Sequence, residues 1–235
     1  MRPRPRLALA LVATTLICGA WAPSPSGVAF HREDVEQMFP EPASIDYEGT
    51  TGHRVVFIGD SLGRLVEVAL PRRFVPRYRL HHFSRPTSGL HDLRGLMARQ
   101  AATRPDVFIA ELGSADISSH RIEDITAWLN DAMDILTDVP CVIWPTVKEH
   151  GVDAWYNRHW QPEAAELNAA IRYQAAVRPG VHVYDWADIS LHHPAWLLED
   201  YLHPNWQGAD RYAQGLRAMA DQCMATRFAV PFQSG

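Results

Sequence analysis

The sequence contains little lysine and no clusters of positive charge. Lys148 is the only lysine among the 22 basic residues of this 235-residue chain, a skew that indicates a G+C-rich genome. The formal net charge is -5, which argues against a nucleic-acid-binding protein. With 47% hydrophobic and 21% charged residues, the composition excludes disordered and fibrous classes. The length suffices for one α/β domain of ordinary size or two very small ones.

Cysteine is also scarce, and the sequence lacks a metal-ligand motif. Of its three cysteines, only Cys141 and Cys223 lie beyond residue 18. The histidine pairs at 81–82 and 192–193 lack the spacing of zinc ligands, and there is no H-E-x-x-H motif. We interpret these histidines as structural or surface residues. The sequence therefore predicts no metal and no cofactor.

Long apolar runs are absent beyond the amino terminus. Residues 7 to about 20 form an apolar run that is too short to span a bilayer comfortably, and three arginines precede it. Ala20 and Ala22 supply the small residues of a cleavage site, so residues 1–22 have the layout of a secretory signal peptide. An uncleaved membrane anchor is the alternative, because Pro23 is a poor residue just after a cut. We expect a protein that is secreted or exported to the cell envelope.

The rest of the chain divides into a linker, one domain and a short tail. Residues 23–52 are rich in Pro, Ser, Gly and acidic residues without periodicity, and we interpret them as an extended linker or arm. Residues 53–228 carry the domain, and residues 229–235 form the tail. No internal repeat and no second core are evident.

Within the domain, short apolar runs alternate with amphipathic ones. The predicted strands are 54–58, 78–83, 106–110, 139–144 and 181–184. The predicted helices are 62–70 (stopped by Pro71), 90–103, 122–137, 162–177 and 207–226. Strands that alternate with helices form a parallel sheet covered on both faces. The sequence therefore predicts an α/β fold with about five parallel strands.

A candidate nucleophile follows the first of these strands. Ser61 lies in the segment Gly59-Asp60-Ser61-Leu62-Gly63, on a predicted strand-to-helix turn. Such a turn exposes a serine at the carboxyl edge of the sheet, where α/β sites lie, and the amides at the helix start can stabilise an oxyanion. The competing interpretation is a capping serine with glycines that serve only the turn.

Two families of serine hydrolase match this pattern, and the position of the serine separates them. In the G-x-S-x-G elbow of α/β-hydrolases, several strands and an oxyanion loop precede the nucleophile. Here Ser61 follows the first strand, with only the linker before it. The segment 56–62 instead resembles the first block of the GDSL, or SGNH, hydrolases. This resemblance covers roughly residues 53–225 and implies a flavodoxin-like three-layer sandwich and a serine esterase.

The resemblance also implies where the base lies. The family carries an Asp three residues before a His on one late loop, and Asp200-Tyr201-Leu202-His203-Pro204 matches that block. With this spacing both side chains can face the same serine. His203 is then the general base for Ser61, and Asp200 orients it.

The family pattern is altered at the predicted oxyanion hole. Gly89 has the place of the glycine whose amide joins that of Ser61. In the G-x-N-D block, here residues 113–116, Ala115 occupies the asparagine position, so the side-chain donor is missing. Three alternatives follow. The Ser61 and Gly89 amides stabilise the oxyanion alone, another side chain such as Ser114 replaces the asparagine, or the protein has lost hydrolysis.

Aromatic and basic residues supply weaker clues to the substrate. Four tryptophans lie in loops expected at the same sheet edge as Ser61, and two arginines accompany them: Trp155, Trp160, Trp196, Trp206, Arg85 and Arg158. Aromatic rings at a site can stack on sugars or receive an acyl chain, although they can equally pack the loops. We expect a small-molecule, glycan or glycolipid ester as substrate, and a monomer associated with the cell envelope.

The sequence leaves two functional readings open. In the first, Ser61 forms an acyl-enzyme that water hydrolyses or a sugar hydroxyl intercepts, so the protein is an esterase or an acyltransferase. In the second, the protein is a non-catalytic module that binds envelope glycan or lipid, a reading motivated by Ala115. The fold also permits a disulfide between Cys141 and Cys223 at the edge opposite the site, with two free thiols as the alternative.

Overall fold

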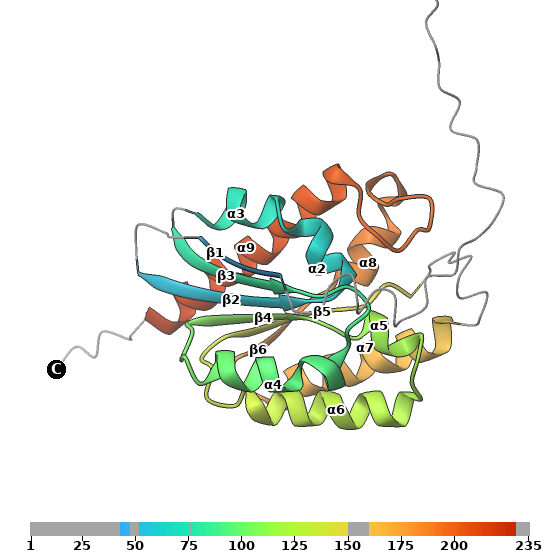
Figure 1. The fold of residues 1–235 in the computed structure, drawn as a ribbon, viewed down its shortest axis with the longest axis horizontal. Helices are drawn as coiled ribbons and strands as arrows, with labels where there is room; N and C mark the ends of the chain where they lie inside the picture. The colour runs from blue at the N-terminus through green and yellow to red at the C-terminus, as the bar shows by residue number, and fades with distance from the viewer. Residues whose placement is uncertain (1–42, 48–51, 76, 150–159, 229–235) are drawn as a thin grey trace, which may run out of the picture.

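A computed structural model describes residues 43–47, 52–75, 77–149 and 160–228, which form a three-layer α/β sandwich (Figure 1). A central sheet lies between two layers of helices. The predicted signal segment 1–22, the tail 229–235 and most of the arm lie outside the described residues. Among those that are described, no helix is both long enough and apolar enough to cross a membrane.

The central sheet has six strands, in the order β1-β3-β2-β4-β5-β6. The strands are β1 (Ala43–Tyr47), β2 (His53–Gly59), β3 (Tyr78–Ser84), β4 (Val107–Glu111), β5 (Val142–Pro145) and β6 (Val181–Tyr184). All pairings are parallel except that of β1 with β3. The five parallel strands have the flavodoxin-like order. The α/β fold class predicted from the sequence is therefore confirmed.

The sixth strand is the part of the sheet that the sequence analysis did not predict. Strand β1 lies within the segment interpreted as an arm and pairs antiparallel with β3, with Ala43 opposite Ser84 and Tyr47 opposite Leu80. It is a short edge strand with a single neighbour. Its five residues carry no long apolar run, so their pairing depends on the exposed edge of β3 rather than on a local pattern.

The helices lie between the strands, with one correction and with two short helices, Ser114–Ile117 and Trp186–Leu191, that the sequence did not predict. They are α2 (Ser61–Val66), α3 (Ala69–Phe74), α4 (Leu90–Ala101), α5 (Ser114–Ile117), α6 (Ile122–Ile135), α7 (Trp160–Val177), α8 (Trp186–Leu191) and α9 (Trp206–Phe228), with a 3-10 turn, η1 (Pro194–Trp196), before α9. The prediction of one helix stopped by Pro71 is wrong. Pro71 lies in the first turn of α3, where its missing N–H has no intrahelical acceptor to lose.

Two apolar cores hold the helices to the sheet, one on each face. Successive side chains of β2 alternate between them, with Val56 in one core and Val55 in the other. Helices α4, α6 and α7 cover the first face, and α2, α3 and α9 cover the second (Figure 1). Each large apolar side chain buried in this way stabilises the folded state by about 1.5–3 kcal/mol relative to the same side chain left exposed to water.

The topology fixes where a ligand can bind. The chain passes from β2 to β3 on one side of β2 and then crosses to β4 on its other side, so the strand order reverses beside β2. In sheets of this type the crevice at the carboxyl ends of such strands is the usual binding position. Ser61 follows β2, and the Gly113–Asp116 segment follows β4, so both lie at this point.

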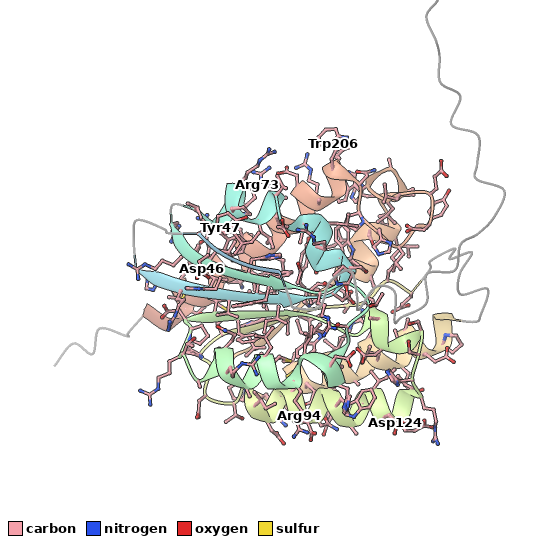
Figure 2. All side chains as sticks on the ribbon, viewed as in Figure 1. Asp46, Tyr47, Arg73, Arg94, Asp124 and Trp206 are labelled. Atoms are coloured by element: carbon pink, nitrogen blue, oxygen red, sulfur yellow. A yellow bond between two sulfur atoms is a disulfide. The ribbon has the colours of Figure 1, made fainter. Side chains whose placement is uncertain are left out.

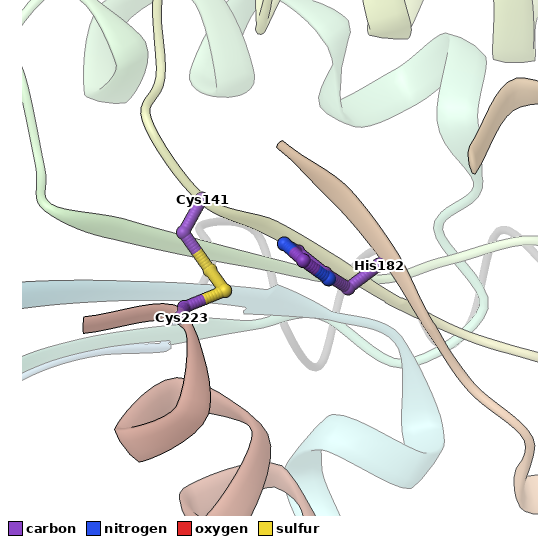
Figure 3. Close-up of side chains that lie close together, drawn as sticks. All are labelled: Cys141, His182 and Cys223. Carbon is purple, nitrogen blue, oxygen red and sulfur yellow. A yellow bond between two sulfur atoms is a disulfide. The ribbon is translucent and has the colours of Figure 1, made fainter. Parts of the chain in front are cut away.

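A disulfide ties the last helix to the opposite edge of the sheet. Cys141, just before β5, is bonded to Cys223 of α9 across 82 residues of sequence, with the two Cα atoms 6.1 Å apart. His182 of β6 lies beside the bond (Figure 3), and its pKa is lowered by burial. Of the two alternatives left open by the sequence, the structure shows the disulfide.

Candidate active site

The nucleophile turn is the tight connection between β2 and α2. Asp60 caps α2, and its carboxylate Oδ1 accepts the Leu62 N–H at 3.0 Å. Ser61 is the first residue of the helix. The glycines on either side are needed for packing, because a Cβ at Gly59 would lie 2.7 Å from the Glu111 carboxyl and one at Gly63 would lie 3.0 Å from the ring of Phe57.

The structure brings the three predicted catalytic side chains into one hydrogen-bonded chain. Ser61 Oγ lies 2.9 Å from His203 Nε2, and His203 Nδ1 lies 2.6 Å from Asp200 Oδ2. Because a carboxylate can only accept, the neutral imidazole carries its proton on Nδ1 and leaves Nε2 free to accept the serine hydroxyl. This is the arrangement of a nucleophile, a base and an orienting acid.

The loop before α9 fixes the base by local backbone bonds. Asp200 Oδ1 accepts the Leu202 N–H at 3.0 Å and the His203 N–H at 2.9 Å. Tyr201, between the acid and these amides, has a positive φ of 53°, which bends the chain back on itself. Asn205 then caps α9 through the Gln207 and Gly208 amides.

The hydrogen bonds of this loop also set the charge of Asp200. Burial on its own would raise the pKa of the carboxyl group. The bonds from the His203 ring and from the two backbone amides outweigh burial, so the pKa of Asp200 lies below its ordinary value. The carboxylate is therefore ionised at neutral pH and can stabilise an imidazolium on His203.

The predicted oxyanion donors differ in their availability. No described residue accepts the Ser61 N–H, whereas the three amides that follow it in α2 are all bonded. The Gly89 N–H, the second predicted donor, instead points to Asp92 Oδ2 at 3.1 Å. In this arrangement the Ser61 amide is the donor left open for an oxyanion.

The altered block after β4 makes its contacts through the Ala115 backbone and the Asp116 side chain. Ala115 is half-buried, and its N–H donates to Asp60 Oδ2 at 3.2 Å. Ser114, the predicted substitute, is 4% exposed, and its Oγ has no partner among the described residues. The Asp116 carboxylate accepts the Leu90 N–H at 2.9 Å and lies against Gly89.

A buried carboxyl pair beneath Ser61 is the feature that the sequence analysis missed. Glu111 ends β4 and is 3% exposed, and Asp60 is fully buried beside it. Burial raises the pKa of Asp60, and burial together with the nearby Asp60 charge raises the pKa of Glu111 well above its ordinary range. The signal in the sequence was an acidic residue at the end of an otherwise apolar strand.

One residue of the predicted histidine pairs supports the same turn. His82 of β3 is fully buried, stacks on Phe57 and lies 3.1 Å from the carbonyl oxygen of Gly63 through Nε2. Burial lowers the pKa of His82 to about 4, so its ring is neutral and donates from Nε2. The structural role expected of this histidine is therefore confirmed.

The predicted substrate-binding aromatics are only partly described. Trp206, at the start of α9, is 85% exposed (Figure 2), and Trp196 is half-buried with its ring stacked on His193 at 3.8 Å between centroids. Arg85 follows β3, and its N–H donates to the Gly59 carbonyl oxygen at 3.0 Å, so its backbone lies beside the end of β2. The side chains of Trp155, Arg158 and Trp160 lie outside the described residues.

Among the described residues, one trio of potential metal ligands is close enough to share an ion. It consists of Cys141, His182 and Cys223, whose ligand atoms all lie within 4.8 Å of one another (Figure 3). Both sulfur atoms are bonded to each other, so neither is a thiolate ligand. The trio lies at the amino ends of the strands, away from Ser61.

Comparisons with known proteins agree with this architecture. No protein-family model and no curated protein matches the sequence. Among solved structures, LAE5, an alpha/beta hydrolase enzyme from the metagenome of Lake Arreo, superposes with a TM-score of 0.57 at 20% identity, covering 76% of this chain and 98% of LAE5. The C-terminal catalytic domain of Streptococcus pneumoniae peptidoglycan O-acetyltransferase A gives 0.58 at 17% identity, covering 75% and 97%.

A third solved structure shows the same likeness. A carbohydrate esterase family 3 protein from Talaromyces cellulolyticus superposes with a TM-score of 0.57 at 15% identity, covering 74% of this chain and 99% of that one. At these identities the likenesses establish the fold.

Proposed function

We propose that this protein is an exported serine esterase or acyltransferase that acts on acyl groups of a carbohydrate. The observation that carries the proposal is the chain from Ser61 through His203 to Asp200, with distances of 2.9 and 2.6 Å. The neighbouring structures, among them a peptidoglycan O-acetyltransferase domain and a carbohydrate esterase, support the choice of a carbohydrate ester.

The geometry supports a two-step reaction through an acyl-Ser61 intermediate. In the first step Ser61 Oγ attacks the ester carbonyl as His203 Nε2 takes its proton, and the Ser61 N–H stabilises the oxyanion. His203 then returns the proton to the leaving alcohol. In the second step His203 activates either water, which gives hydrolysis, or a sugar hydroxyl, which gives transfer.

Labelling and kinetics test this proposal together. We expect a fluorophosphonate to modify Ser61, and we expect the protein to hydrolyse p-nitrophenyl acetate. Ser61→Ala should abolish labelling and lower kcat about 10³-fold or more. Asp200→Asn keeps an oxygen for the two loop amides but loses the anion that orients His203, so kcat should fall about 10³–10⁴-fold. Equal rates for wild type and Ser61→Ala would reject the enzyme assignment.

The choice between hydrolysis and transfer needs a separate measurement. Incubation with an acetyl donor and a chitooligosaccharide acceptor should yield acetylated sugar if a hydroxyl intercepts the acyl-enzyme, and only free acetate if water does. Mass spectrometry of the sugar distinguishes the two products. Export is tested by sequencing the amino terminus of the protein in its native host, where cleavage near Ala22 is expected.

A second candidate function is a non-catalytic glycan-binding module. The observation in its favour is the poor oxyanion hole, with Ala115 lacking a polar side chain and the Gly89 amide bonded to Asp92. Under this alternative the protein binds acylated oligosaccharides in calorimetry, whereas fluorophosphonate leaves Ser61 unmodified.

A further inference from the structure

The Glu111 carboxyl lies directly beneath the nucleophile turn. Its Oε2 accepts the Gly63 N–H at 2.9 Å and the Asp60 N–H at 3.2 Å. These two amides flank Ser61 in the sequence. One side chain from the end of β4 thus holds the turn on both sides of the nucleophile.

Glu111 and Asp60 are also buried beside each other, with Glu111 Oε2 3.2 Å from the Asp60 backbone nitrogen. Two ionised carboxylates that neighbour each other in a buried site repel strongly, and burial together with the Asp60 charge raises the pKa of Glu111. A proton on one of the two groups removes this repulsion and lets that group donate to the other, because a carboxylate only accepts. The pair therefore holds one proton.

The contacts of the two side chains indicate which one carries that proton. Asp60 accepts amides on both oxygens, from Leu62 on Oδ1 and from Ala115 on Oδ2, which stabilises an anion. Both amide bonds of Glu111 fall on Oε2, so Oε1 is available for the proton.

We propose that Glu111 is a positioning residue for Ser61, acting as a neutral carboxylic acid that donates to Asp60 and accepts the two amides around the nucleophile. The proposal rests on the function proposed above for Ser61. Asp60 in turn holds the Ala115 amide, so the same pair links the nucleophile turn to the loop after β4. Glu111 therefore fixes the relative placement of the two loops that border the oxyanion site.

Other titratable groups surround the pair and define its electrostatic setting. Burial raises the pKa of Asp60, and His203 in the loop before α9 lowers it. Burial and the Asp60 charge raise the pKa of Asp116 in α5, and burial with both carboxyl groups raises the pKa of Tyr212 in α9. His82, which binds the Gly63 carbonyl, is neutral. Loss of the shared proton would add a second negative charge beneath Ser61 and oppose formation of an oxyanion there. Activity should therefore fall when this proton is lost at alkaline pH.

Two substitutions at Glu111 test the proposal. Glu111→Gln keeps an oxygen for the amides and an N–H for Asp60 but cannot ionise, so kcat should stay within about threefold of wild type and the alkaline fall in kcat should disappear. Glu111→Ala removes the support, and a misplacement of about 1 Å should lower kcat roughly 10²-fold with little change in KM. A Glu111→Gln variant as impaired as Glu111→Ala, or a Glu111→Ala variant with wild-type kcat, would overturn the proposal.

Measurements that need no substrate keep the proposal separate from the proposed function. Infrared difference spectra of wild type minus Glu111→Gln, taken above pH 8, should contain the carbonyl band of a protonated carboxylic acid. Hydrogen exchange of the Gly63 amide should be slow in wild type and Glu111→Gln; the Asp60 amide also donates to the Glu111 backbone carbonyl oxygen at 3.3 Å and does not report on the side chain. Absence of the acid band, or equally slow exchange in a folded Glu111→Ala variant, would reject the positioning role. Failure of Ser61 to react with fluorophosphonate would reject only the proposed function.

Discussion

The Gly89 N–H donates to the Asp92 carboxylate, 3.1 Å away, so in this arrangement it is not available to an oxyanion at Ser61. Gly89 caps α4, and Asp92 is an exposed acid in the first turn of that helix. Helix starts commonly satisfy their amides in this way. Here the same bond occupies the second amide that the sequence analysis assigned to the oxyanion hole.

Removal of Asp92 should therefore raise activity. In Asp92→Ala the Gly89 amide is free to join the Ser61 amide. Since one oxyanion donor is typically worth about 10²–10³ in rate, we expect kcat for p-nitrophenyl acetate to rise about tenfold or more. The loss of the helix cap should cost roughly 1 kcal/mol of stability. Asp124→Ala, which removes an exposed first-turn acid from α6, is the matched control. An unchanged or lower kcat in folded Asp92→Ala would show that the Gly89 amide is not a donor in the reaction.

The exposed ring of Trp206 should affect carbohydrate substrates selectively. With 85% of its surface exposed, it contributes little to the core and is available to stack on a sugar. We expect Trp206→Ala to raise KM for an acetylated oligosaccharide about three- to tenfold and to leave the kinetics on p-nitrophenyl acetate unchanged. Tyr173→Ala of α7, an aromatic residue that is 63% exposed, is the control. Equal losses of activity on both substrates would show that Trp206 supports the fold and does not bind the sugar.

The disulfide should matter for stability and not for catalysis. Closing 82 residues of sequence between Cys141 and Cys223 restricts the unfolded chain, an effect of about 4 kcal/mol in the loop-entropy description. The double variant Cys141→Ser/Cys223→Ser should lose about that much unfolding free energy in urea. Its kcat at 25 °C should stay unchanged, because the bond lies at the edge of the sheet opposite Ser61. A dithiol reductant should destabilise the wild type and leave the double variant unaffected, and a wild type that does not respond would contradict the prediction.

Asp116 should make the protein more stable in mild acid. Burial, with the nearby charges of Asp60 and Asp92, raises the pKa of Asp116 from 3.8 to about 7. The folded state therefore binds a proton that the unfolded state releases between pH 7 and 4, so stability rises as pH falls through this window. The total gain is on the order of 4 kcal/mol.

Comparison with Asp116→Asn isolates this contribution. The carbonyl of the substituted amide still accepts the Leu90 N–H but cannot titrate. The unfolding free energy of wild type minus that of Asp116→Asn, measured in urea, should increase from pH 8 to pH 4 and then level off. The difference isolates the titration of Asp116 together with its interaction with Asp60, and a difference that does not change with pH would contradict the raised pKa.

The sequence by itself determined the five parallel strands, the longer helices and the order in which they follow one another. The apolar runs of the five parallel strands, the serine directly after the first of them and the Asp200–His203 spacing are local features. Alternation of strands and helices predicts a parallel sheet, whose carboxyl edge carries both the turn with Ser61 and the late loop. The resemblance to the GDSL hydrolases then implied the chain from Ser61 to Asp200 before any distance was known.

The tertiary structure decided everything that depends on which groups meet across the chain. The pairing of β1 required the free edge of β3, and the disulfide required α9 to pack near the start of β5. The contact of Glu111 with the nucleophile turn joins residues 51 positions apart in the sequence, and no local pattern specifies it. Hydrogen bonds and pKa values respond to distances of a few ångströms, whereas sequence periodicity fixes only the face on which a side chain lies.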